Sequence, residues 1–408
     1  MHKRLQNFIT EFPRQFWIVF TGTLINSTGG GMVFPFLTLY LNQHLNLSMT
    51  WVGVILAFWS VSGLFGQIAG GTFADRFGRK RLMAFSLALN ACALATFGFV
   101  ETFAAAVAVV IVAGFSNALY QPARDAMIAD LVGSAKRPHA YSLIRVVANF
   151  GLTIGPALGG FLAAQSYLIP FLANASATFT YFLITATLMR ETKPPTTPHQ
   201  PNAAAPGNLL TVLRDTRFIV FLVGGVLCTF LAAQMMAVLP VYMNSAFGLG
   251  ASYYGWVMTT NAAMVVMLQF LITRATIHLP RLLLAATGAI LYALGVGSVG
   301  LSDTFPHFIL AMALYTLGEL ILVPTASALT ADLAPADLRG RYMGMYGLTW
   351  AVGFGIGPIL GGLISDALSP RVVWFLTAPA GLCAALIFLA LARFAPLHPR
   401  PAPPPPAT

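Results

Sequence analysis

The chain of 408 residues is far too apolar for a water-soluble protein, because 57% of its residues are hydrophobic and 8% are charged, against about 25% charged residues in ordinary soluble domains. A mean hydropathy of +0.77 agrees with this. A soluble globular enzyme is therefore excluded. The net charge of +10 does not indicate nucleic-acid binding, because the basic residues fall in short loops between apolar segments, which is how membrane orientation is encoded.

Twelve apolar stretches are long enough to cross a bilayer, which takes about 20 residues per helix. The first of them is followed by no small-residue cleavage site, so we expect an uncleaved first helix. The predicted class is an all-α membrane protein. Its spans are expected at 16–41, 51–74, 82–100, 104–130, 140–164, 168–189, 218–243, 253–273, 282–301, 306–332, 342–365 and 372–393.

Basic residues are distributed unevenly between the two sides of these spans. The N-terminal segment, the alternate loops and the C-terminal segment hold 19 of the 22 lysines and arginines, and all of these regions lie on one side. Positively charged loops stay in the cytoplasm. We therefore expect both termini to be cytoplasmic.

The chain is predicted to divide into two bundles of six helices. A Pro- and Ala-rich composition favours an extended linker and a disordered tail. The predicted divisions are a cytoplasmic N-terminal segment (1–15), an N-terminal bundle (16–189), a cytoplasmic linker (190–217), a C-terminal bundle (218–394) and a disordered tail (395–408).

An internal repeat connects the two halves. Residues 120–162 align without a gap on residues 322–364, an offset of 202, with 13 of 43 positions identical, and the same offset places Gly53 on Gly255. A repeat of six helices is parallel, and two such bundles suit alternating access around a midplane site.

The loop between the second and third spans reads Gly71-Thr-Phe-Ala-Asp75-Arg76-Phe-Gly78-Arg79-Lys-Arg. It resembles the loop signature of the major facilitator superfamily, with Phe in place of the usual Leu. The resemblance implies that Asp75 accepts N–H groups from the start of the eleventh span, where a helix dipole favours an anion. It also implies that Arg79 pairs with Asp130, so that Gly71, Asp75, Arg76, Gly78, Arg79 and Asp130 form a conformational latch. The offset places Ile277 opposite Asp75, so the latch is expected on one side only.

The fifth span carries a Gly/Pro pattern that the eleventh span repeats, and this pattern resembles the helix-five motif of the drug/proton antiporters within the superfamily. Small residues let helices approach closely, and proline favours a bend. The motif residues are Gly151, Gly155, Pro156, Gly159 and Gly160 in the fifth span, and Gly353, Gly357, Pro358, Gly361 and Gly362 in the eleventh.

Few ionisable residues lie within the spans, where they are costly and usually functional. Glu319 is thirteen residues from Asp332, about 20 Å along a helix, and so near the midplane. Burial there favours loading and release of a proton, and Glu319 matches an acid that multidrug antiporters of the superfamily use for coupling. Asp125 is expected to pair with Arg145 or with its neighbour Arg124, either as part of the proton coupling or as static packing.

Aromatic and neutral amide side chains dominate the expected substrate cavity, and such surfaces bind apolar or cationic molecules. The cavity candidates are Asn26, Phe34, Tyr40, Tyr120, Asn149, Gln234, Tyr242, Tyr315 and Trp350. The three cysteines lie far apart inside apolar runs and suggest neither a disulfide nor a metal site. The chain has no Walker-type sequence, so ATP is not the expected energy source, and neither an enzyme nor a cofactor is predicted.

These features predict a monomeric exporter of lipophilic small molecules, cationic ones included, that works by exchange for protons. It is similar to bacterial multidrug/proton antiporters and is expected in the lipid bilayer of a bacterial-type inner membrane. One alternative is a proton-coupled carrier for one metabolite or lipid. Another is a ligand sensor that uses the same fold without transport.

Overall fold

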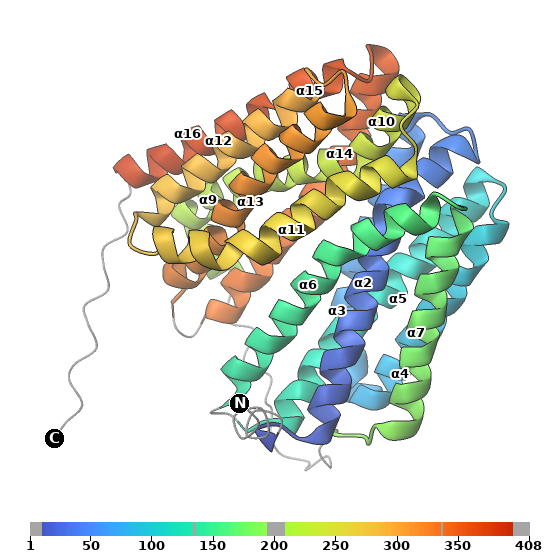
Figure 1. Cartoon of the computed structure of the whole chain (residues 1–408). Coiled ribbons are helices and arrows are strands. Elements are labelled where there is room, and N and C mark those ends of the chain that lie inside the picture. The colour runs from blue at the N-terminus through green and yellow to red at the C-terminus, as the bar shows by residue number, and fades with distance from the viewer. Residues whose placement is uncertain (1–9, 134–135, 194–208, 336–337, 395–408) are drawn as a thin grey trace.

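The structure is a computed structural model that describes residues 10–133, 136–193, 209–335 and 338–394, and these residues form helices joined by short turns (Figure 1). Among the described residues, twelve helical segments are long and apolar enough to cross a membrane. The predicted all-α class is confirmed. The parts of the predicted N-terminal segment, linker and tail at 1–9, 194–208 and 395–408 lie outside the described residues.

The N-terminal half supplies six spans, within about three residues of their predicted bounds. They are α2 (Arg14–Gln43), α3 (Met49–Phe77), α4 (Arg79–Thr96) with its extension η1 (Phe97–Phe99), α5 (Phe103–Leu131), α6 (Arg137–Ala163) and α7 (Leu168–Leu188).

The C-terminal half supplies the other six, and its seventh and twelfth spans are interrupted. Pro240 and Pro379 have no N–H to continue an α-helical ladder, and each lies at the start of a new segment. The elements are α9 (Thr216–Ala233), the π-helical η3 (Gln234–Val238), α10 (Leu239–Phe247), α11 (Ala251–Thr276), α12 (Arg281–Val299), α13 (Phe305–Leu333), α14 (Arg339–Ala367), α15 (Val372–Thr377) and α16 (Pro379–Phe394). A short helix, α8 (Leu209–Arg214), lies in the segment predicted as an extended linker.

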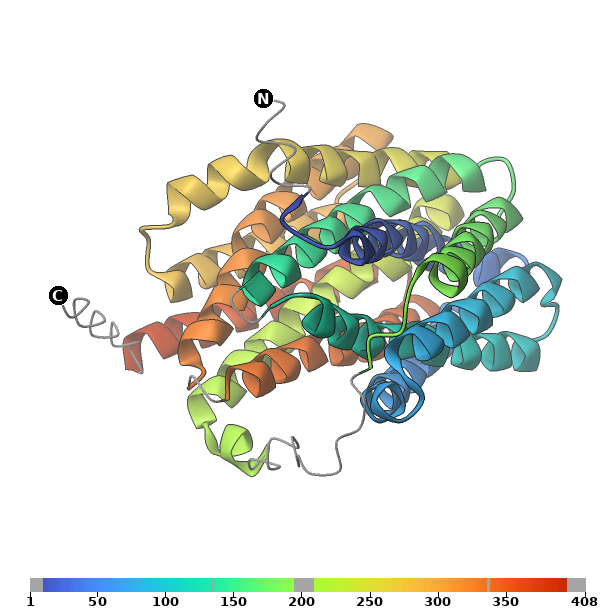
Figure 2. The ribbon, with the colours of Figure 1, turned by 90° about the horizontal axis from the view of Figure 1, so that it is seen from below.

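Two bundles contact each other along α3 with α14 and along α6 with α11. Figure 1 shows them converging where α10 and α15 lie and diverging toward the other end. We call that other end, which carries Arg76, Arg79, Lys80 and Arg81, the basic face, and the end where α3 starts the opposite face. Viewed from below, the blue-to-green and yellow-to-red halves lie beside each other (Figure 2).

Glycines at the repeat offset form the contacts between the bundles. A Cβ on Gly160 of α6 would lie 2.3 Å from the Cα of Gly255 on α11, and one on Gly362 of α14 would lie 2.3 Å from the carbonyl oxygen of Met49 on α3. Gly160 and Gly362 are 202 residues apart, as are Met49 and Ala251, the first residues of α3 and α11. The sequence repeat therefore appears as two equivalent contacts near the opposite face.

The remaining motif glycines pack each bundle internally. In α6 they face α2, where a Cβ on Gly155 would lie 2.5 Å from the carbonyl oxygen of Thr28. In α14 they face α9 and η3, where a Cβ on Gly353 would lie 2.2 Å from Thr229 Oγ1. Similar close contacts are made with α2 by Gly151 and Gly159, and with α9 and η3 by Gly357 and Gly361.

We expect Gly155→Ala to destabilise the protein by about 1–3 kcal/mol, because the added methyl group would overlap a backbone oxygen. Thermal unfolding in detergent measures the effect as a lowered midpoint. Gly30→Ala is the matched control, because a Cβ on Gly30 of α2 meets nothing within 4 Å. Equal midpoints for the two variants would contradict the proposed packing constraint.

Candidate functional site

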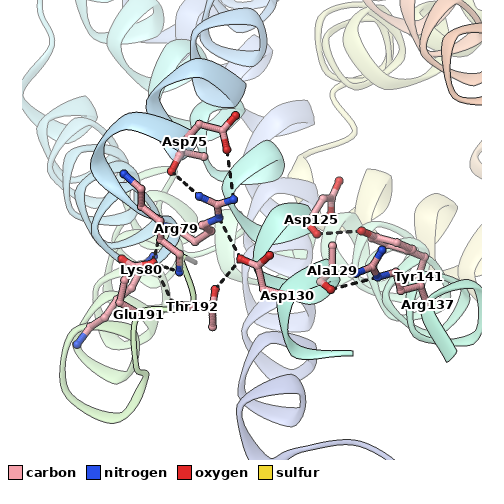
Figure 3. A network of polar contacts seen from close by, with 12 residues as sticks. Asp75, Arg79, Lys80, Asp125, Ala129, Asp130, Arg137, Tyr141, Glu191 and Thr192 are labelled. Carbon is pink, nitrogen blue, oxygen red and sulfur yellow. Dashed lines mark hydrogen bonds and ion pairs between the residues drawn. The ribbon is translucent and has the colours of Figure 1, made fainter. Parts of the chain in front are cut away.

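A cluster of charges on the basic face joins α3, α4 and α5 (Figure 3). Arg79 begins α4, and its Nε lies 3.0 Å from Asp130 Oδ2 at the end of α5. Its second guanidinium nitrogen lies 3.2 Å from Asp75 Oδ1. The Arg79–Asp130 pair implied by the resemblance is therefore present, within the N-terminal bundle.

Asp75 occupies a different environment from the one expected. Its side chain is 76% exposed and pairs with Arg79, one turn away, rather than capping α14. The reason is that the bundles diverge at this face (Figure 1). Gly71 has open space around it, and the Arg76 guanidinium lies 5.4 Å from the Phe77 ring centroid. Within the described part of the chain, the hydrogen bonds and ion pairs of the predicted latch residues stay within their own bundle and the segment after α7.

Glu191, which sequence reasoning missed, holds the start of α4. Its carboxylate accepts hydrogen bonds from the backbone N–H groups of Arg79 at 2.8 Å, Lys80 at 3.4 Å, Thr192 at 3.0 Å and Lys193 at 3.1 Å. Partial burial raises the pKa of Glu191, but these four hydrogen bonds outweigh it and lower the pKa below its ordinary value. The helix dipole adds a further preference for an anion here.

Gly78 explains why the loop signature requires glycine at that position. Its φ is +99°, in the region that favours glycine. A Cβ there would also lie 2.4 Å from Glu191 Oε2. Thr192 Oγ1 donates to Asp130 Oδ2 at 3.1 Å, so the segment after α7 is tied to both α4 and α5.

We expect the Glu191 contacts to be sensitive to acid. A carboxyl group whose pKa is lowered by folding stabilises the folded state above its unfolded pKa of about 4.3, and this contribution is lost as pH falls through the folded pKa. Glu191→Gln should therefore lower the thermal midpoint at pH 7 and flatten its decline below about pH 4.3. Glu101→Gln, an exposed acid on the opposite face, is the matched control. An unchanged pH profile in Glu191→Gln would contradict this role.

Arg124 and Asp125 form a local pair inside the N-terminal bundle. Arg124 Nε donates to Asp125 Oδ1 at 2.9 Å, and its guanidinium lies 5.6 Å from the Tyr120 ring centroid. The Tyr120 hydroxyl lies 3.0 Å from the hydroxyl of Tyr181 and 3.3 Å from Thr23 Oγ1. Of the two partners expected for Asp125, the structure contains the neighbouring Arg124.

Arg145 instead reaches the other bundle. One of its guanidinium nitrogens donates to Ser327 Oγ on α13 at 3.3 Å. Among the described residues, no carboxylate lies within ion-pair distance of it. Arg145 is therefore a cation between the bundles whose contact must change if they move.

Glu319 is the fifteenth of the 29 residues of α13, and so lies at the helix centre. Its Oε2 accepts a hydrogen bond from Asn261 Nδ2 on α11 at 2.6 Å, and the same amide lies 3.0 Å from Thr316 Oγ1. No basic side chain in the described part of the chain forms an ion pair with it. A partly exposed carboxyl held by one neutral donor can change its protonation state without breaking a salt bridge.

The cavity candidates separate into accessible and packed residues. Phe34 contacts Phe354 of the other bundle at 5.6 Å between ring centroids, and Trp350 stacks on Phe354 at 5.7 Å. Asn26 is partly exposed and Asn149 is exposed. These four positions remain candidates for substrate contact.

Five other candidates are buried among the helices in this conformation, and their place in the substrate cavity stays a prediction. Tyr40 donates to the carbonyl oxygens of Phe97 and Val100, and Gln234 donates to that of Gly357 at 2.8 Å. Residue type alone cannot tell such structural hydrogen bonds from ligand contacts. The other three are Tyr120, packed inside its bundle, Tyr242, 5.5 Å from Trp374, and Tyr315, stacked on Tyr292 at 4.4 Å.

Comparison with known proteins decides the family. The family model described as Major Facilitator Superfamily matches residues 19–244 and 221–408. The chain belongs to this superfamily. Transport and a multi-pass location in a membrane of the bacterial inner-membrane type follow from the family, the twelve apolar helices and the bacterial relatives.

Curated relatives resemble the chain over nearly its whole length. It is 28% identical to the uncharacterised transporter YhjO of Bacillus subtilis over 90% of both chains. It is 26% identical to a Na(+), Li(+), K(+)/H(+) antiporter of Planococcus maritimus, covering 90% of this chain and 91% of that one. It is 26% identical to the multidrug resistance protein MdtH of Escherichia coli, covering 88% and 89%.

Solved structures agree in fold. A nucleoside transporter, NupG, superimposes with a TM-score of 0.73 at 15% identity, covering 92% of this chain and 99% of that one. A POT family transporter in complex with 5-aminolevulinic acid gives a TM-score of 0.75 at 15% identity, covering 93% and 96%. At these identities the likeness concerns the fold alone.

Proposed function

We propose that this protein exports lipophilic compounds in exchange for protons, by alternating access. The observation that carries the proposal is the environment of Glu319, a carboxyl group at the centre of α13 that accepts a hydrogen bond from the neutral amide of Asn261. An acid within a membrane is a functional candidate by default. Two relatives with similar coverage, one a cation/proton antiporter and one a multidrug resistance protein, support the same reading.

Orientation follows from the distribution of basic residues. The basic face carries the loop between α3 and α4, and lysines and arginines accumulate on the cytoplasmic side of membrane proteins. With that face in the cytoplasm, the bundles diverge toward the cytoplasm and contact each other on the far side (Figure 1). The conformation is then the inward-facing state of the cycle.

Proton coupling needs a group whose charge differs between the two states. We assign this role to Glu319, which binds a proton from outside and releases it when the bundles diverge toward the cytoplasm. Arg124 and Asp125 neutralise each other inside one bundle, which favours packing for that pair. Arg145 contacts Ser327 across the bundles, so it responds to their movement rather than to a proton.

The substrate is proposed to be amphiphilic. The accessible candidates Phe34 and Trp350 are aromatic and belong to opposite bundles, linked through Phe354. Aromatic surfaces bind apolar molecules through contact area and attract cations to the ring face. A lipophilic cation therefore suits this surface. Glu319 in its charged form offers a negative charge to such a cation in the same protein.

The proposal is tested by transport in vesicles that contain the purified protein, with an imposed pH gradient and tetraphenylphosphonium as the probe. We expect Glu319→Gln to reduce gradient-driven accumulation to the level of empty vesicles while tetraphenylphosphonium binding persists, because the amide cannot carry the proton. Glu101→Gln is the control and should transport normally.

Uphill transport that persists in Glu319→Gln would contradict the coupling role. Transport confined to one compound in a panel of dyes, lipids and metabolites would favour the single-substrate carrier instead. Ligand binding without flux in the unmodified protein would favour the sensor.

A further inference from the structure

A carboxylate from one bundle caps a helix of the other bundle at the opposite face. Asp366 lies at the end of α14, and its two carboxylate oxygens accept hydrogen bonds from the N–H groups of Met49 at 3.2 Å and Thr50 at 2.8 Å, at the start of α3. The Thr50 hydroxyl also donates to it at 2.6 Å. The first N–H groups of a helix lack partners within the helix, so Asp366 satisfies two of them from across the bundle contact.

Neither of the two helices concerned has a capping side chain of its own. Ser48, at the N-cap position of α3, makes no side-chain capping hydrogen bond, and neither does Leu338 at the start of α14. A helix start without a capping side chain is less stable than a capped one. Each helix start is therefore open to an acceptor supplied by the other bundle.

The helices α3 and α14 run antiparallel along their contact, so the end of each faces the start of the other. Asp366 lies near the end of α14 and Asp75 near the end of α3. In this structure Asp366 engages the start of α3, while the Asp75 side chain is 76% exposed and pairs with Arg79 of its own bundle. The start of α14 has no capping hydrogen bond from the side chain of its N-cap residue, Leu338. The two acids thus occupy equivalent positions at the two ends of one seam, and one of them is engaged.

The other seam, between α6 and α11, has no such acids. The repeat offset of 202 relates Asp366 to Ala164, at the end of α6, and Asp75 to Ile277, at the end of α11. Of the two seams, the α3/α14 seam therefore carries an acid near the end of each of its helices. The α6/α11 seam relies on the backbone contact of Gly160 with Gly255.

We propose that Asp366 is the opposite-face counterpart of Asp75, and that the two acids cap α3 and α14 alternately as the bundles rock. This inference rests on the alternating access proposed above. Rigid bundles that touch at one face diverge at the other, so the two caps exclude each other. Each cap stabilises one end state, because an anion is favoured at a helix start.

Two pairs of spin labels test the alternation in the full chain, after Cys92, Cys228 and Cys383 have been replaced. One pair at the exposed positions Trp51 and Leu368 reports the opposite face. The other, at Thr72 and Gly344, reports the basic face, and both positions are exposed. Pulsed electron paramagnetic resonance then gives the proportion of each state.

We expect Asp366→Asn to shift the ratio of the two states by about two- to thirty-fold toward separation at the opposite face, the range for a charge at a helix terminus. Asp75→Asn should shift the ratio the other way, and the double variant should lie between them. Asp303→Asn is the matched control, because this exposed acid at the opposite face pairs with Arg371 of its own bundle.

Two results would overturn the inference. One of them leaves the proposed alternating access standing, and the other does not. If both states are populated but Asp366→Asn behaves like Asp303→Asn, the assignment of Asp366 fails while alternating access stands. If no variant populates a second distance at either face, both the latch and the proposed cycle fail.

Discussion

Everything in this fold depends on the close approach of helix backbones at four glycines related by the internal repeat. Gly160 meets Gly255, and Gly362 meets the start of α3 near Gly53. Lipid provides no hydrophobic drive for one apolar helix to bind another, so close packing between small residues must hold the bundles together. Because these contacts lie near the opposite face, they fix the end at which the bundles touch and leave the basic ends apart.

The charged residues differ in whether they bind partners within their own bundle or across the contact between the bundles. Arg79, Asp75 and Asp130 form a compact cluster within one bundle, and Glu191 binds the first N–H groups of α4 beside it. Asp366 makes hydrogen bonds across the bundle contact. Glu319, at the centre of α13, is separate from both groups. In the proposed mechanism, proton binding and the contacts that close the bundles therefore belong to different acids, so one can change its charge without breaking the other's hydrogen bonds.

The sequence predicted those helices and contacts that depend on a local pattern of residues. Apolar runs located the helices, the offset of 202 located the glycine contacts, and the loop signature located the Arg79–Asp130 pair. It failed where a contact depends on distant partners, because Asp366 binds residues more than 300 positions away and Glu191 binds residues 112 and 111 away. Tyr40 and Gln234 donate hydrogen bonds to backbone carbonyl groups in this conformation, and polarity in the sequence does not reveal whether a side chain faces a cavity or a neighbouring helix.

The interrupted seventh span breaks the equivalence of the two halves. At the repeat offset Pro35 of α2 aligns with Ala237, and Pro240 aligns with Thr38, so the related helices carry their prolines at different depths. The seventh span includes the π-helical segment Gln234–Val238, whereas α2 is assigned as one α-helix. A π-helical turn changes the rotation of the residues that follow it about the helix axis, so the two bundles are not interchangeable in spite of the sequence repeat.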